Sequence, residues 1–109
     1  MNSGAEGVET ALKLARKWGY LIKKIPYNKA IILACSGNFH GRTIGVISMS
    51  TSSEATSHFG PLLPGVGPCY SGSKEPIRYG NIDDLKQALS VHGKEVAAFL
   101  VEPIQGEAG

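Results

Sequence analysis

The chain has 109 residues, of which 42% are hydrophobic and 18% are charged, a balance typical of one globular domain and not of a disordered chain. Its formal net charge of +2 comes from scattered basic residues, and no basic stripe with interleaved aromatic residues indicates nucleic-acid binding. No run of about 18 apolar residues indicates a membrane span.

The first expected element is a helix over residues 4–20. Its apolar residues recur at helical spacing, which predicts one buried face. That face would hold Val8, Leu12, Ala15, and either Trp18 or Gly19. Because glycine often follows the last turn of a helix, we expect Gly19 to be its C-cap.

Two apolar runs predict strands that are buried on both faces. They cover residues 30–35 and 96–104, and Pro103 is expected to end the second. Residues 43–50 fit either a strand or a helix, and we favour the helix. The Gly/Pro/Ser-rich segment 53–76 is expected to be a long loop, and such loops are often functional.

The last expected helix covers residues 82–93, with Asn81 or Asp83 as its N-cap and Gly93 after its end. Helices therefore alternate with strands along the chain. This order predicts the α/β class, with a mostly parallel sheet and flanking helices.

The two cysteines lie far apart and lack the spacing of metal ligands. Cys35 ends an apolar run, which predicts a buried thiol, and Cys69 lies in the long loop. Free thiols of this kind favour an intracellular, reducing compartment.

The segment "NSGAE" could form an anion site at the start of the first helix. Ser3 can cap the helix, and Gly4 lets a ligand approach the backbone. The N–H groups of Gly4, Ala5 and Glu6 would then suit a phosphate. An ordinary N-cap is the alternative interpretation.

The segment "GNFHGRT" places three chemically distinct side chains between glycines. Phe39 could stack on a flat ring, His40 could titrate or hydrogen-bond, and Arg42 could grip a carboxylate with two parallel bonds. A core phenylalanine beside surface polar residues would give the same pattern.

The segment "VEPIQGEAG" follows the second expected strand, at the end where open α/β sheets bind ligands. Glu102, Gln105 and Glu107 share this turn. Its two carboxylates could position an amine or pair with an arginine, and a simple polar turn remains the alternative.

Taken together and in this order, "NSGAEGVETALKLARKWGY", "GNFHGRT", "HFGPLLPG" and "VEPIQGEAG" resemble the class III (subgroup II) aminotransferases. Members of that family use pyridoxal 5'-phosphate (PLP) on fold type I. The resemblance covers essentially the whole chain and implies that residues 1–109 are the N-terminal part of the PLP-binding large domain. The "KWGY" and "GEAG" forms favour the members that act on ornithine. Acetylornithine and 4-aminobutyrate enzymes, and a non-catalytic phosphate-binding α/β module, remain alternatives.

The resemblance implies a set of cofactor contacts. Gly4 and Ala5 would offer N–H groups to the PLP phosphate, with Ser3 beside them. Phe39 would stack on the pyridine ring, and Glu102 would lie close to it.

The resemblance also implies substrate contacts. Arg42 would take the substrate α-carboxylate, and Glu107 would pair with a later arginine and gate between the two half-reactions. His40 would form part of the substrate wall, where some relatives carry Trp.

The family's Schiff-base lysine lies downstream of "GEAG", and none of the eight lysines here lies in a matching motif. We therefore expect no catalytic residue within the chain, and a fragment that is inactive alone. The resemblance implies a homodimeric parent that acts on small amino acids and keto acids, without nucleic acid or membrane as partners. The family occurs in the cytosol in some lineages and in mitochondria in others; we favour the cytoplasm, with the mitochondrial matrix as the alternative.

Overall fold

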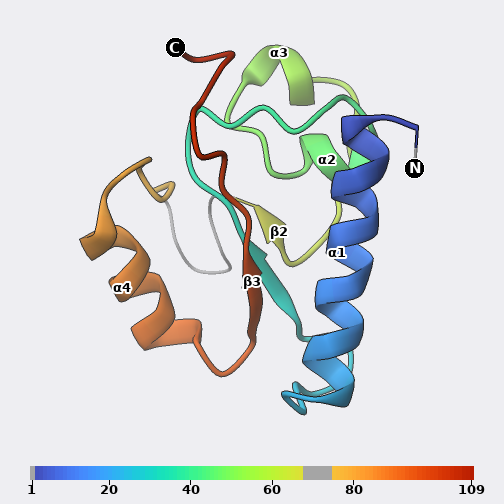
Figure 1. Cartoon of the computed structure of the whole chain (residues 1–109), viewed down its shortest axis with the longest axis vertical. Helices are drawn as coiled ribbons and strands as arrows, with labels where there is room; N and C mark the ends of the chain where they lie inside the picture. The colour runs from blue at the N-terminus through green and yellow to red at the C-terminus, as the bar shows by residue number, and fades with distance from the viewer. Residues whose placement is uncertain (1, 68–74) are drawn as a thin grey trace.

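The computed structural model describes residues 2–67 and 75–109 and contains a parallel sheet with helices on both faces (Figure 1). The sheet has three strands in the order β2-β1-β3. They are β1 (Ile31–Leu33), β2 (Val66–Gly67) and β3 (Val96–Phe99). Both strand pairs are parallel, which confirms the expected α/β class.

Four helices surround this sheet in the described part of the chain. Helix α1 (Gly4–Leu21) covers one face and α4 (Ile82–His92) covers the other, as Figure 1 shows. Two short helices, α2 (Ile44–Ile47) and α3 (Ser53–Thr56), lie in the connection from β1 to β2. None of the helices in the described ranges is long and apolar enough to cross a bilayer.

Strand β1 contributes to both hydrophobic cores because alternate side chains leave a strand on opposite faces. Ile32 packs in one core with Leu12 of α1, and Leu33 packs in the other core with Ala88 of α4. Leu33 has 0% of its surface exposed. The unbroken apolar run in the sequence therefore marks a strand buried on both faces.

Helix α1 continues past the expected end. Its C-cap is Ile22, so the expectation that Gly19 is the C-cap is wrong. Gly19 lies buried inside the helix, where a Cβ atom would come within 2.9 Å of Ile25 Cδ1 and 3.1 Å of Ala97 Cβ. Glycine thus allows the helix to approach β3 closely. Trp18 is 44% exposed, so Gly19 is the residue of this pair that faces the core.

The remaining elements confirm some of the expected boundaries and correct others. Helix α4 starts after Asn81, one of the two expected N-caps, whose side chain accepts a hydrogen bond from Asp84 N. Residues 43–50 contain a helix, α2, as we favoured, although it is only four residues long. Strand β3 ends at Phe99, well before Pro103, so the expected strand was too long.

The long loop and the two cysteines were also expected from the sequence. Segment 53–76 contains α3 and the two-residue strand β2, which are too short to give a periodic signal. Cys69 lies outside the described residues, whereas Cys35 is buried, as expected.

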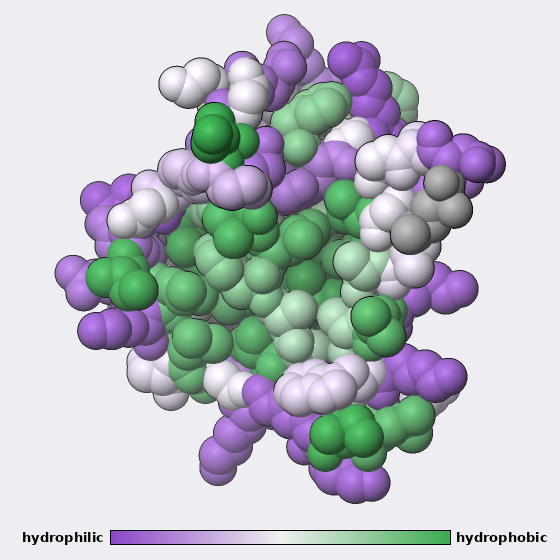
Figure 2. Space-filling model, in the orientation of Figure 1, coloured by the Kyte–Doolittle hydropathy of each residue, from purple (hydrophilic) through white to green (hydrophobic). Residues whose placement is uncertain are grey.

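Strand β3 forms one edge of the sheet. Within the described residues it pairs only with β1. Figure 2 shows an apolar patch at the centre of this face of the molecule, where β3 lies in Figure 1. Residues 97–100 are only half-buried and Val101 is 44% exposed, so the edge is apolar and uncovered by the part of the chain that the structure describes.

Candidate functional site

The segments that follow β1 and β3 meet at one edge of the sheet, because parallel neighbours end on the same side. The N–H of Phe39 donates a hydrogen bond to Glu102 Oε1 over 3.0 Å. The Gln105 amide donates to the carbonyl oxygen of Ser36 over 2.9 Å. These two hydrogen bonds thus join the segment after β1 to the segment after β3, more than sixty residues away in the sequence.

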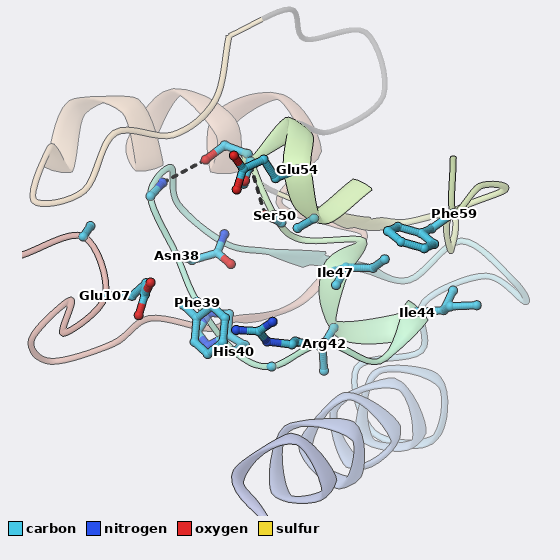
Figure 3. A pocket seen from close by; sticks show the side chains of 17 residues that line it. Asn38, Phe39, His40, Arg42, Ile44, Ile47, Ser50, Glu54, Phe59 and Glu107 are labelled. Atoms are coloured by element: carbon cyan, nitrogen blue, oxygen red, sulfur yellow. Dashed lines mark hydrogen bonds between the residues drawn. The ribbon is translucent and has the colours of Figure 1, made fainter. Parts of the chain in front are cut away.

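A cavity of about 590 Å³ opens beside these segments. Phe39, His40 and Arg42 line it, and Glu107 reaches it from the C-terminal segment (Figure 3). The Arg42 guanidinium carbon lies 5.7 Å from the centre of the Phe39 ring, within the range of a cation–π contact. Phe39 is 42% exposed, so part of its ring is accessible to a ligand.

His40 carries an unpartnered polar atom at this site. Its Nε2 is buried and has no hydrogen-bond partner among the described residues. Burial lowers the pKa of His40, and the negative charge of Glu102 opposes that shift. The lowered pKa favours the neutral form of the imidazole, and Nε2 has no hydrogen-bond partner in the part of the chain that the structure describes.

The start of α1 is capped as its sequence predicts. Ser3 Oγ accepts a hydrogen bond from Glu6 N over 3.2 Å, and the Glu6 carboxylate accepts one from Asn2 N over 2.6 Å. The Glu6 N–H is thereby used inside the chain. Within the described ranges the N–H groups of Gly4 and Ala5 have no acceptor, so the cap and the proposed anion site are compatible.

Helix α1 touches the arginine segment directly. A Cβ atom on Gly41 would lie 2.8 Å from Ala5 Cβ, and Gly41 has φ of +132°. In Figure 1 the start of α1, the segment after β1 and the C-terminal segment lie at the same end of the molecule. The expected residues form two neighbouring groups, since Ser3, Gly4, Ala5 and Glu102 do not line the cavity.

Two connections at this site carried no signal in the sequence. The Tyr79 hydroxyl donates to the carbonyl oxygens of Glu102 and Pro103 at 2.7 and 2.9 Å. Thr43 Oγ1 donates to the Glu9 carboxylate. Both link segments that only the tertiary fold brings together, so residue spacing could not reveal them.

Two further observations concern the Cys35 thiol and groups of metal-ligating side chains. Burial, and to a lesser extent the charge of Glu102, raise the pKa of the Cys35 thiol, which disfavours the reactive thiolate. Among the described residues there is no group of three or more His, Cys, Asp or Glu side chains that could hold a metal ion.

The chain is similar in sequence and fold to known proteins. The model of the family "Aminotransferase class-III" matches residues 1–109. Ornithine aminotransferase car2 of Schizosaccharomyces pombe is 64% identical over the whole chain, which spans 25% of that protein's length. A crystal structure of the ornithine aminotransferase from Toxoplasma gondii, with partial occupancy of PLP at its active site, is 46% identical with a TM-score of 0.88. The chain covers 24% of it.

A solved acetylornithine aminotransferase from Elizabethkingia anophelis is 40% identical, with a TM-score of 0.66, and the chain covers 20% of it. The chain therefore spans about a quarter of the curated relative's length and matches these proteins over all of its own. Since the family model covers every residue, the chain belongs to the class III aminotransferase family.

Proposed function

We propose that the chain is part of an ornithine δ-aminotransferase that passes an amino group from ornithine to 2-oxoglutarate, giving glutamate semialdehyde and glutamate. The observation that carries this proposal is the placement of Arg42. It lies over the Phe39 ring in the cavity, one residue from the point where α1 contacts the same segment. A guanidinium that can bind a carboxylate, placed beside an aromatic ring, suits an amino-acid substrate bound against a flat cofactor.

The residues present fit PLP as the cofactor. The N–H groups of Gly4 and Ala5 would hold its phosphate, because they lack acceptors in the described chain and begin an 18-residue helix. The exposed part of the Phe39 ring would lie against the pyridine. Ser3 lies beside the two amides, and Glu102 is held close by its bond from Phe39 N.

When bound, PLP supplies the electron sink through which an amino group leaves one substrate and joins another. The chain's own residues bind and orient. Arg42 would hold the α-carboxylate with two parallel hydrogen bonds, and neutral His40 would form part of the substrate wall and offer a hydrogen bond through Nε2. Glu107 lines the cavity, where we propose that it pairs with an arginine of the parent enzyme.

We further propose that residues 1–109 are part of the PLP-binding large domain of a homodimeric parent. The apolar edge of β3 supports this assignment. Parallel sheets are normally covered, and a bare apolar edge strand invites pairing with another strand. For the parent we propose a cytoplasmic location, with the mitochondrial matrix as the alternative, because the buried thiol of Cys35 suits a reducing compartment. Cell fractionation would test the location.

The test uses the full-length protein that contains this chain. We expect it to bind PLP and to turn over ornithine with 2-oxoglutarate. Arg42→Ala should raise the KM of both substrates by at least about tenfold, since a hydrogen bond to a charged group contributes about 1.5–3 kcal/mol. Arg16→Ala is the matched control, because Arg16 lies on α1 away from the cavity and its guanidinium donates to the Pro64 carbonyl oxygen.

Equal KM values for wild type and Arg42→Ala would contradict the assignment of Arg42. A second candidate is acetylornithine transamination, favoured by the likeness to the Elizabethkingia enzyme. Higher kcat/KM for N-acetylornithine or 4-aminobutyrate than for ornithine would replace the proposed substrate. PLP binding without any turnover would favour a non-catalytic module.

A further inference from the structure

A row of contacts joins the first two turns of α1 to the segment that carries Arg42. Ala5 contacts Gly41, on one side of the arginine. The Glu9 carboxylate accepts a hydrogen bond from Thr43 Oγ1, on the other side. A Cβ atom on Gly45 would lie 2.6 and 2.7 Å from the two Glu9 carboxylate oxygens, so the carboxylate rests against that glycine.

The geometry of an α-helix explains why both contacts come from α1. Ala5 and Glu9 are four residues apart and therefore lie on the same face of the helix. The helix turn that offers the Gly4 and Ala5 amides is thus rigidly connected to Glu9. Both neighbours of Arg42 are held against this one rigid element.

The Arg42 side chain makes few contacts that could orient it. Its side chain is exposed, and within the described residues its recorded partner is the Phe39 ring. Its direction therefore depends mainly on the backbone from which it projects. That backbone is fixed by the Ala5 contact before it and by the hydrogen bond between Thr43 and Glu9 after it.

We propose that Glu9, acting through Thr43, is a positioning residue for Arg42, which it holds at a set distance from the N-terminal amides of α1. Glu9 touches neither substrate nor cofactor in this role. It determines how well the site binds a carboxylate, and it leaves the remaining contacts of the substrate unaffected. This inference rests on the proposed function, in which Arg42 receives the substrate carboxylate.

The experiment measures binding of two ornithine analogues to the full-length holoenzyme by calorimetry. One, 5-aminopentanoate, keeps the carboxylate and the terminal amine; the other, 1,4-diaminobutane, keeps both amines and lacks the carboxylate. Thr43→Val removes the donor with little change of shape. We expect it to weaken 5-aminopentanoate about tenfold, the effect of one hydrogen bond to a charged group, and to leave 1,4-diaminobutane within about twofold.

Three variants complete the design. Thr43→Ser keeps the hydroxyl and should restore wild-type binding. Glu9→Ala should reproduce the loss and decides the question if Thr43→Val does not fold. Thr10→Val is the matched control, because the Thr10 hydroxyl donates within α1 to the Glu6 carbonyl oxygen over 2.9 Å and should leave both analogues unchanged.

Equal weakening of both analogues, unchanged binding of 5-aminopentanoate, or no binding of it to the wild type would each overturn the proposal. Because binding is measured directly, absence of ornithine turnover by the wild type would count against the proposed function alone.

Discussion

Gly41→Ala tests whether the contact between α1 and the arginine segment stabilises the fold. Gly41 has φ of +132°, a conformation that side chains rarely adopt, and an added Cβ would lie 2.8 Å from Ala5 Cβ and 3.4 Å from Ala5 Cα. A methyl group there must either move the start of α1 or move the segment that carries Arg42. The substitution therefore combines backbone strain with a steric clash.

The two costs can be estimated separately. Backbone strain at a residue in a sparsely populated conformation costs about 1–3 kcal/mol. Overpacking by one methyl group against a fixed neighbour costs about 1–3 kcal/mol more. We therefore expect the free energy of unfolding to fall by about 2–6 kcal/mol.

Gly80→Ala is the matched control for this variant. Gly80 also has a positive φ, +76°, and nothing lies within 4 Å of its added Cβ. It should show the strain alone, at about 1–2 kcal/mol. The difference between the two variants then reports the contact with Ala5.

The assay is urea unfolding of the full-length apo protein, combined with a PLP titration. Combining Gly41→Ala with Ala5→Gly removes the methyl group that the new Cβ meets, so the double variant should recover part of the loss. Coupling of at least about 0.5 kcal/mol is expected for residues in contact. PLP affinity should fall for Gly41→Ala and not for Gly80→Ala, since only the former displaces the Ala5 amide. Equal losses for the two glycine variants, with no coupling to Ala5, would refute this reasoning.

Three further outcomes follow from the described contacts. Leu33→Ala should lower the free energy of unfolding by about 2–5 kcal/mol, because the side chain is wholly buried, whereas Leu14→Ala, at a residue 68% exposed, should have little effect in the same denaturation assay. The Arg78 guanidinium lowers the pKa of Asp84 in the folded protein to about 2, so the stability that Asp84 contributes is present above about pH 4 and is lost as the pH falls toward 2. Asp84→Asn should therefore make the free energy of unfolding less dependent on pH over that range. Burial lowers the pKa of His40, so NMR titration of its ring should give a midpoint below that of a free histidine.

The sequence was most informative where one local rule determines the structure. The cap at Ser3, the start of α4 after one of the two expected N-caps and a buried strand within residues 30–35 follow from residue type and periodicity alone. Gly19 was misinterpreted because a glycine near a helix end looks the same whether it terminates the helix or lets a strand approach. Only the neighbouring Ala97 distinguishes the two cases.

The candidate site divides in the same way. The motif around Phe39 and Arg42 is visible in the sequence, and so is the turn that contains Glu102. The bond from Tyr79 to the Glu102 carbonyl oxygen has no local signal, since it joins positions 23 residues apart through the fold. Residue types thus predict the chemistry of the site, and the tertiary contacts that orient it escape prediction.

Two parts of the fold determine the geometry of the site. The contact between α1 and the arginine segment relates the proposed phosphate end to Arg42, and it lies within the first 45 residues. The pairing of β1 with β3 relates Phe39 to Glu102, and it continues beyond the strands as a 2.8 Å bond from Leu100 N to the Leu33 carbonyl oxygen. A slip of β3 by one residue would turn its side chains to the other face and move Glu102 away from Phe39. The register of β3 therefore sets the Glu102 carboxylate beside the proposed cofactor ring, and α1 sets the position of Arg42.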